Sequence, residues 1–106
     1  MQSLEAVRHR QGGNRSVVRY IINVKGKGQG VSFRKSTRRI AEELRLSGWV
    51  KNCTDGSVAA CVEGAESAVQ ALLFWCAIGP ERARVEGLRA DPGEYRNEFS
   101  GFEIRY

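Results

Sequence analysis

The sequence predicts an α+β domain in which two helices pack on one face of a four- to five-stranded antiparallel sheet. Segments rich in β-branched and aromatic residues alternate with two segments whose apolar residues recur every three or four positions. These segments follow the order strand, helix, strand, strand, helix, strand, and a further short strand closes the chain. With 106 residues the chain can build one hydrophobic core, so we expect a single folded domain.

The first half of the chain predicts a strand, a loop and a helix. Residues 17–24, VVRYIINV, have the composition of a strand that is buried on at least one face. Residues 25–32, KGKGQGVS, have glycine at three alternate positions and predict a tightly turned loop. From Phe33 to Leu44 the apolar residues follow helical spacing, and Ser47-Gly48 is expected to end this helix.

The second half predicts a hairpin, a helix and two strands. The predicted ranges are 49–54 and 57–63 for the hairpin strands, 65–76 for the helix, 82–90 for a strand, 91–93 for a turn and 99–106 for the last strand. Asp55-Gly56 is a strong signal for the hairpin turn, and Gly79-Pro80 ends the helix. Two helices on one face of such a sheet form the ferredoxin-like α/β sandwich, an architecture that hosts many functions.

Composition and charge limit the class of protein. The 17 Lys and Arg residues against 12 Asp and Glu residues give a net charge of +5, and no stretch approaches the roughly 20 apolar residues that span a bilayer. Residues 1–16 lack the apolar segment of a secretory signal, so we expect a cytoplasmic protein with a flexible arm at 1–16 and a folded domain at 17–106. The three cysteines form no C-x-x-C pair and are expected to be reduced and mostly buried. His9, the only histidine, lies in the arm, where a surface position is expected.

The loop at 25–32 and the start of the following helix are suited to an anion. Backbone N–H groups of such a loop can converge on one point, and a helix N-terminus adds unpaired N–H groups and the positive end of its dipole. Residues 25–39 carry six basic side chains and no acidic one. The chain lacks both the G-x-x-x-x-G-K-[ST] and the G-x-G-x-x-G patterns, which disfavours nucleoside triphosphates and NAD. From the loop alone, an anion site and a flexible connector both remain open.

Three motifs are more specific than the loop. Residues 26–34 read GKGQGVSFR, residues 47–52 read SGWVKN and residues 55–58 read DGSV. Together they resemble the acylphosphatase family, whose blocks read approximately G-x-V-Q-G-V-x-F-R, G-W/Y-V/A-x-N and D/N-G-x-V. The resemblance covers roughly residues 17–106. It implies hydrolysis of acyl phosphates, the mixed anhydrides of a carboxylic acid and phosphate, to carboxylate and inorganic phosphate.

The resemblance also implies a role for individual residues. Arg34 matches the arginine that binds the phosphoryl group, and Asn52 matches the asparagine that positions the attacking water. The phosphate-binding residues implied in this way are Gly28, Gln29, Gly30, Val31, Ser32, Phe33 and Arg34. No cofactor and no metal are implied. Gly28 stands where the family usually has valine, so we expect a more flexible loop that loses ordering entropy when phosphate binds.

These residue types suit the chemistry. A planar guanidinium and fixed backbone amides match the negative charge that a phosphoryl group spreads over its equatorial oxygens during transfer. The carboxylate leaving group needs no protonation near neutral pH, so catalysis needs neither a histidine nor a carboxylate pair. A side-chain amide accepts from water and donates to phosphate, which orients the nucleophile. The sequence leaves open whether the phosphate or the carboxylate of the substrate accepts the proton.

Two other functions stay open at this point. A basic nucleic-acid-binding module has the same topology, but the aromatic RNA-recognition motif is missing and residues 57–63 contain no aromatic residue. An acylphosphatase-like domain that binds carbamoyl phosphate, as in hydrogenase-maturation carbamoyltransferases, would take an overlapping substrate. We expect a monomer that acts on a small acyl phosphate, with no nucleic-acid partner and no membrane partner.

Overall fold

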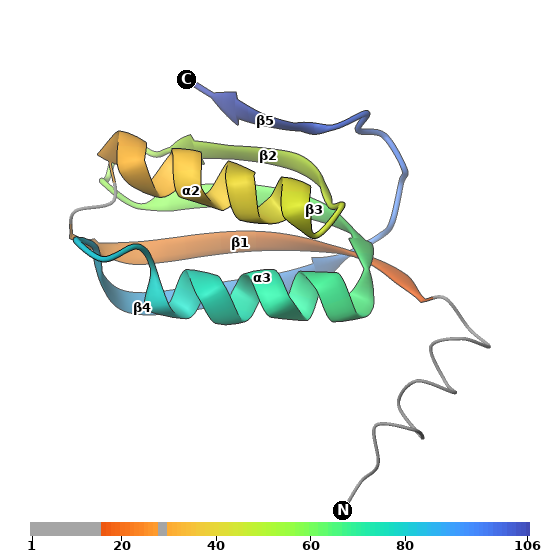
Figure 1. Ribbon diagram of the computed structural model, residues 1–106, viewed down its shortest axis with the longest axis horizontal. Helices are drawn as coiled ribbons and strands as arrows, with labels where there is room; N and C mark the ends of the chain where they lie inside the picture. Colours follow the sequence, from red (N-terminus) through yellow and green to blue (C-terminus); the bar gives the residue numbers. More distant parts are fainter. Residues whose placement is uncertain (1–15, 28–29) are drawn as a thin grey trace, which may run out of the picture.

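The computed structural model describes residues 16–27 and 30–106, which form five strands and two helices (Figure 1). In chain order the elements are β1 (Val17–Lys27), α2 (Gly30–Glu43), β2 (Ser47–Asn52), β3 (Val58–Ala65), α3 (Glu66–Ile78), β4 (Arg84–Gly93) and β5 (Phe102–Arg105). The predicted arm lies outside the described residues except for Ser16, and so do Gly28 and Gln29 of the predicted loop. Neither described helix has the length and apolarity needed to cross a bilayer.

The five strands form one sheet in the order β4-β1-β3-β2-β5. All neighbours are antiparallel except β2 and β5, which run parallel. The parallel pair arises because the connection from β4 to β5 stays at one end of the sheet while it passes from one edge to the other (Figure 1). The predicted fold class is confirmed, and the added C-terminal strand makes the sheet mixed.

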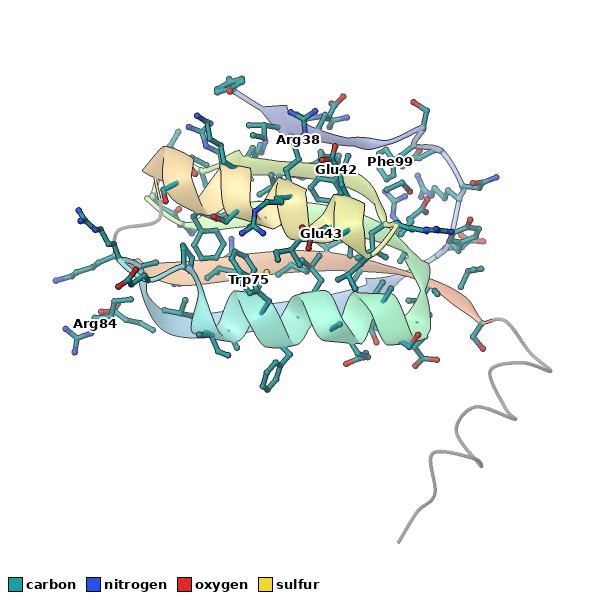
Figure 2. All side chains as sticks on the ribbon, in the orientation of Figure 1. Arg38, Glu42, Glu43, Trp75, Arg84 and Phe99 are labelled. Atoms are coloured by element: carbon teal, nitrogen blue, oxygen red, sulfur yellow. The ribbon has the colours of Figure 1, made fainter. Side chains whose placement is uncertain are left out.

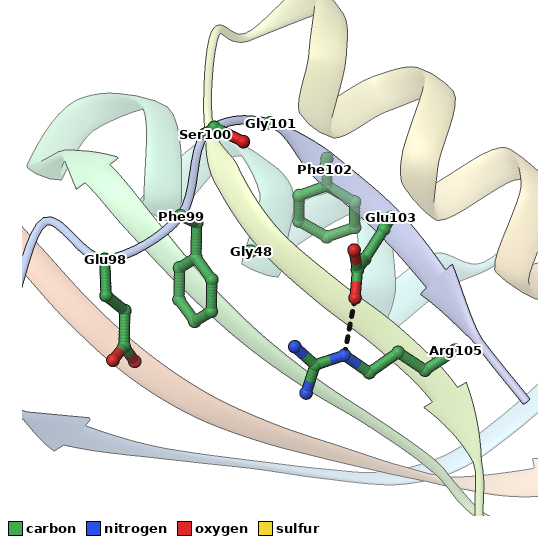
Figure 3. A pocket seen from close by; sticks show the side chains of 8 residues that line it. All are labelled: Gly48, Glu98, Phe99, Ser100, Gly101, Phe102, Glu103 and Arg105. Carbon is green, nitrogen blue, oxygen red and sulfur yellow. Dashed lines mark hydrogen bonds and ion pairs between the residues drawn. The ribbon is translucent and has the colours of Figure 1, made fainter.

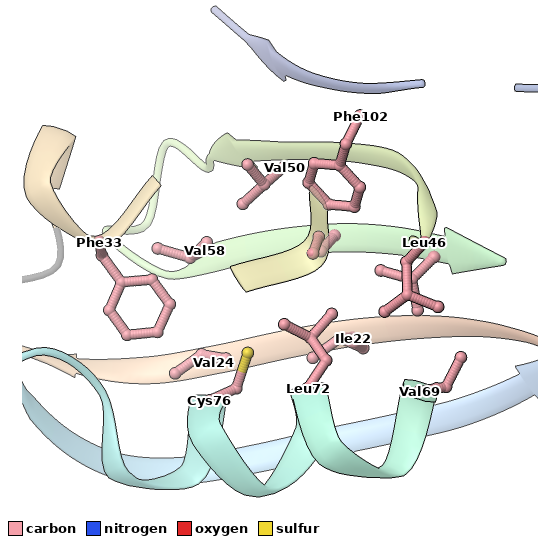
Figure 4. Packing of buried hydrophobic residues seen from close by; sticks show 13 residues of the cluster. Ile22, Val24, Phe33, Leu46, Val50, Val58, Val69, Leu72, Cys76 and Phe102 are labelled. Atoms are coloured by element: carbon pink, nitrogen blue, oxygen red, sulfur yellow. The ribbon is translucent and has the colours of Figure 1, made fainter. Parts of the chain in front are cut away.

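Both helices cover the same face of the sheet, and the core lies between them and the strands (Figure 4). Side chains of a strand alternate between the two faces of a sheet, and Ile22 and Val24 of β1 and Val58 and Val62 of β3 face the helices with 2% exposure or less. The core is completed by Phe33 and Ala41 of α2, Val69, Leu72 and Cys76 of α3, Val50 of β2, Phe102 of β5, Leu46 and Ala60.

The cysteines follow this burial pattern. Cys61 and Cys76 are buried and Cys53 is half-buried, and all three are free thiols. Burial raises the pKa of Cys76 to about 12, and burial also raises the pKa of Cys61. Both buried thiols therefore stay protonated near neutral pH and act as small apolar core residues.

The face of the sheet away from the helices carries one buried carboxylate, Glu63, with 1% exposure. Its oxygens accept hydrogen bonds from the backbone N–H of Arg96 at 2.7 Å, the guanidinium of Arg19 at 3.0 Å and the backbone N–H of Glu98 at 3.4 Å. Arg19 also donates to Glu98 at 2.7 Å, and its guanidinium lies 5.4 Å from the ring centroid of Phe99. Glu63 and Arg19 thus anchor the connection from β4 to β5 on the sheet.

The turn predicted at 91–93 is wrong, because Asp91, Pro92 and Gly93 belong to β4. They pair with Ile21, Tyr20 and Arg19 of β1, respectively. Proline has no backbone N–H to donate to a neighbouring strand. An interior strand has a neighbour on each side, whereas β4 lies at the edge of the sheet and has a neighbour on one side, so an N–H on its open side needs no partner. A proline-glycine pair therefore indicated a turn where an edge strand forms.

The predicted end of the first helix at Ser47-Gly48 is also wrong. The helix ends at Glu43, and the N–H groups of Arg45 and Leu46 donate to the carbonyls of Glu42 and Ala41. Arg45 adopts a left-handed φ of 61° in this Schellman-type turn, a position that glycine usually occupies. The chain then enters β2, where Gly48 serves a different purpose: a Cβ atom there would lie 1.8 Å from the carbonyl oxygen of Cys61.

Candidate active site

The C-terminal ends of β1 and β2 lie at the same end of the sheet. Val58, the first residue of β3, is the partner of Val24 in β1 and of Asn52 in β2. Because β1 and β2 are both antiparallel to β3, they run in the same direction and finish at the same end of the sheet. β1 leads there to α2, so the N-terminus of α2 and the end of β2 lie at the same end of the molecule (Figure 1).

The helix α2 begins at Gly30, three residues before the predicted start at Phe33. Residues 30–32, expected in a loop, therefore belong to its first turn, and the first four N–H groups of a helix have no partner within it. This first turn contains no acidic residue, which leaves the positive end of the helix dipole available to an anion. Gly28 and Gln29 lie outside the described residues, and the side chain of Val31 is likewise not described.

Arg34 is buried with 7% exposure, an unusual environment for a guanidinium. Its Nε atom is buried and has no hydrogen-bond partner among residues 16–27 and 30–106. The guanidinium carbon lies 4.8 Å from the centroid of the Tyr106 ring. A buried cation near a helix N-terminus opposes the dipole of that helix, so the arrangement calls for an anionic partner.

Phe33 holds this part of the helix in place. Its side chain is fully buried and points into the core (Figure 4). Its ring contacts that of Trp75 on α3 at a centroid distance of 5.5 Å. The hydroxyl of Thr37 donates to the carbonyl of Phe33 at 2.8 Å. Phe33 therefore offers the predicted site only its backbone N–H. The neighbouring Ser32, by contrast, is exposed.

Asn52 is the last residue of β2 and is exposed. Val50, two residues earlier, is fully buried beneath the helices, so the alternation of side chains directs Asn52 to the same face. Arg34 projects from α2, which covers that face. The structure thus brings the two residues of the sequence prediction to the same end and the same side of the sheet.

Tyr106 completes the arrangement, and sequence reasoning treated it only as part of the final strand. Arg105 of β5 pairs with Lys51 of β2, so the next residues along the two parallel strands, Tyr106 and Asn52, are neighbours. No motif marked this tyrosine, because its position follows from the parallel pairing of β5 with β2.

The hairpin turn after Asn52 contains polar residues of the DGSV motif to which the sequence analysis gave no role in the site. Ser57 is buried with 3% exposure, and its backbone N–H and hydroxyl both donate to Oδ1 of Asp55, at 2.9 and 2.7 Å. The side-chain amide of Asn23 on β1 donates to the Ser57 hydroxyl at 3.1 Å. The Ser57 hydroxyl, followed by the Ser57 backbone N–H, lowers the pKa of Asp55 because both donate to its charged form.

Other basic residues of the segment 25–39 are explained by the surface of α2. Arg38 and Glu42 form an ion pair at 3.2 Å, and Arg39 and Glu43 form one at 3.6 Å, each across one helical turn (Figure 2). All four side chains are about half exposed or more. Their ion pairs and exposure are typical of ordinary surface charge rather than of contact with a ligand.

A cavity of about 300 Å³ lies elsewhere in the described part of the chain, beginning at Gly48 at the opposite end of β2 from Asn52. Phe99, Gly101 and Arg105 contribute to its lining (Figure 3). Arg105 is paired with Glu103 at 2.7 Å, so its charge is already matched. This cavity is separate from the helix N-terminus at which the anion is expected.

Comparison with known proteins agrees with the fold and with the family resemblance of the motifs. The acylphosphatase family model matches residues 20–104. The chain is 48% identical over 89 residues to the acylphosphatase of Geotalea uraniireducens, covering 84% of this chain and 98% of the relative. It is 53% identical over 92 residues to that of Aeropyrum pernix, covering 86% and 91%. The structure of an acylphosphatase from Coxiella burnetii superposes with a TM-score of 0.80 at 35% identity, covering 86% and 95%.

Proposed function

Since this chain belongs to the acylphosphatase family and is an acylphosphatase that hydrolyses acyl phosphates, we propose that Arg34 binds the phosphoryl group and Asn52 positions the attacking water. The observation that carries this proposal is the buried Nε of Arg34, a charged donor without a partner in the described part of the chain. A phosphate oxygen would supply an acceptor for this donor. Leaving a buried donor unpaired costs about 1–3 kcal/mol, which substrate binding would recover.

The N–H groups of the first turn of α2 would share the phosphoryl group with Arg34. Backbone donors are fixed by the helix, so they need no reorganisation when charge develops on the equatorial oxygens. Ser32 and Phe33 contribute through their main chain, as do Gly30 and Val31. Gly28 and Gln29, implied by the family resemblance, remain predictions because they lie outside the described residues.

The Asn52 carboxamide would hold water in line with the bond that breaks. Its oxygen accepts a hydrogen bond from the water and its Nδ2 donates one to a phosphate oxygen, so one side chain sets the direction of attack. The water oxygen bonds to phosphorus as the bond between phosphorus and the acyl oxygen breaks. The electron pair of the broken bond leaves with the carboxylate, and the proton of the water passes to an oxygen of the phosphate or of the carboxylate. A carboxylate is a stable anion at neutral pH, so no general acid is required.

We further propose that the reaction needs neither a metal nor a cofactor and that the enzyme is a cytoplasmic monomer without a nucleic-acid partner. The odd number of free thiols supports a reducing compartment. The alternatives of a nucleic-acid-binding module and of a carbamoyl-phosphate-binding domain are not favoured, since the chain covers nearly the whole length of single-domain acylphosphatases.

The test is hydrolysis of benzoyl phosphate by the purified chain in the presence of EDTA. We expect that EDTA does not change the rate of turnover. We also expect that inorganic phosphate at about 1 mM, a concentration in the range of typical KM values, inhibits competitively. Loss of turnover in EDTA that added Mg²⁺ restores would overturn the metal-independent mechanism. Gel filtration of the same sample tests whether the enzyme is a monomer.

A further inference from the structure

The turn after Asn52 is fixed by more than its strand ladder. The last pair of the β2–β3 ladder is Asn52 and Val58, and beyond it the N–H of Cys53 donates to the carbonyl of Ser57 at 2.8 Å. Asp55 receives both the backbone N–H and the hydroxyl of Ser57 on one carboxylate oxygen. The backbone bond closes the turn, and the carboxylate fixes its shape.

Asn23 ties this turn to a different strand. It lies on β1 opposite Ala59, and its Nδ2 reaches the hydroxyl of Ser57 at 3.1 Å. A hydroxyl has one proton, and Ser57 uses it to donate a hydrogen bond to Asp55. Towards Asn23 the Ser57 hydroxyl is therefore the acceptor. The result is a directed chain of hydrogen bonds from Asn23 through Ser57 to Asp55.

This chain connects the two halves of the active site. β1, which carries Asn23, leads to α2 and therefore to Arg34, whereas the turn held by Asp55 begins directly after Asn52. Apart from the ladder through β3, the Asn23–Ser57 hydrogen bond is a side-chain link between these halves. Charged acceptors give stronger and more directional hydrogen bonds than neutral ones, so Asp55 makes the link stiff.

We propose that Asp55 and Asn23 are positioning residues for catalysis, which act through Ser57 to hold the Asn52 carboxamide in line with the phosphate bound at α2. This inference rests on the proposed role of Asn52. A displacement of about 1 Å at a reacting group can cost as much as 100-fold in rate, so a turn that is free to shift would slow the reaction without weakening phosphate binding.

The test compares Asp55→Ala and Asp55→Asn, each in the native chain and in an Asn52→Ala background, with benzoyl phosphate as substrate. Asp55→Ala should lower kcat about tenfold and leave KM within about twofold, because Arg34 still binds the phosphoryl group. Asp55→Asn should restore most of kcat, because its amide oxygen still accepts from Ser57. In the Asn52→Ala background, Asp55→Ala should cause no further loss.

Asn23→Ala tests the same chain of hydrogen bonds from β1 and keeps the turn's own hydrogen bonds, so it remains informative even if Asp55→Ala does not fold. It should lower kcat and leave competitive inhibition by inorganic phosphate unchanged. Asp91→Ala is the matched control, since it removes an exposed aspartate that accepts from Arg89 at 2.9 Å on β4.

The outcomes separate the two proposals. An equal loss from Asp55→Ala in both backgrounds, or a loss no larger than that of Asp91→Ala, would overturn the positioning role and leave the proposed function standing. A rise in KM at unchanged kcat would overturn it as well. Full turnover of Asn52→Ala would refute the proposed role of Asn52 itself, and the positioning role would fall with it.

Discussion

The ring of Tyr106 lies over the guanidinium of Arg34, with 4.8 Å between the guanidinium carbon and the ring centroid. All N–H groups of a guanidinium lie in its plane, so a ring on its face leaves these donors free for in-plane hydrogen bonds to phosphate oxygens. Tyr106 is 93% exposed, so this contact lies at the surface of the site. The pair orients the cation without using a donor.

Replacement of Tyr106 by leucine should raise KM for benzoyl phosphate about threefold, because an exposed cation–π contact is worth about 0.5–1 kcal/mol. Tyr106→Phe keeps the ring and should behave like the native enzyme. The measurement is KM together with the inhibition constant of inorganic phosphate. Equal effects of the phenylalanine and leucine variants would contradict a role for the ring face.

Replacement of Arg34 by methionine should separate activity from stability. Turnover should fall at least about 100-fold, because a contact that stabilises the transition state contributes roughly 3 kcal/mol. The free energy of unfolding should rise by about 1 kcal/mol, since an unpaired buried donor is replaced by an apolar side chain of similar length. Urea denaturation and the benzoyl phosphate assay check the two effects.

Arg39→Met is the control for this variant, because Arg39 is exposed and pairs only with Glu43 among the described residues. It should change neither quantity noticeably. If Arg34→Met kept near-native turnover while folded, the assigned role of Arg34 would be wrong.

The stability of the fold should depend on pH through Glu63. Burial raises the pKa of this carboxyl, but hydrogen bonds from the Arg96 amide, the Arg19 guanidinium and the Glu98 amide outweigh burial, and the net pKa lies below its usual value of 4.5. The Glu63 carboxyl therefore binds its proton more tightly in the unfolded chain than in the folded one. Its contribution to the free energy of unfolding is present above pH 4.5 and is lost as the pH falls below that value.

Glu63→Gln should remove this dependence. It should lower the free energy of unfolding by about 2 kcal/mol at neutral pH and flatten the acid side of the curve between about pH 4.5 and pH 2. Denaturation at a series of pH values measures both. Glu103→Gln, which changes an exposed carboxylate, is the control. Identical acid sensitivity of Glu63→Gln and the native chain would rule out Glu63 as the titrating group.

Gly48→Ala should prevent folding or cost more than about 3 kcal/mol. The added Cβ would lie 1.8 Å from the carbonyl oxygen of Cys61, and the backbone there has a φ of 143°. Gly87→Ala on β4 is the matched control, because no atom lies within 4 Å of its Cβ position. Yields and urea midpoints compare the two variants. A Gly48→Ala protein as stable as Gly87→Ala would show that β2 and β3 can separate locally.

The sequence predicted the fold class, and it singled out the two residues proposed for the site, Arg34 and Asn52, for reasons that can be traced. Strand composition and helical spacing are local properties, so the order of elements could be read directly. Arg34 and Asn52 lie in motifs of fixed spacing, and their positions on the first turns of α2 and at the end of β2 follow from elements that the sequence predicted well.

What the sequence did not predict depends on pairing between distant strands. β1 extends to Lys27 because Gly26 and Lys27 pair with Val85 and Arg84 of β4, and no local signal marks that partner. The parallel pairing of β5 explains why Tyr106 was missed. The end of α2 was predicted wrongly because a glycine that ends a helix and a glycine that allows two backbones to approach closely look the same in a sequence. Gly48 is of the second kind and lies in β2.

Strand order also governs how quickly this chain can fold. Among the four neighbouring pairs of the sheet, only β2 and β3 are joined by a short hairpin, while β1 must find β4, and β2 must find β5, across most of the chain. Loop closure between such distant segments precedes the gain from their contacts, so nascent molecules should mature slowly compared with helical bundles of equal size. During that interval the incomplete sheet exposes unpaired edges, and dilution or chaperone capture should increase the yield of refolded enzyme.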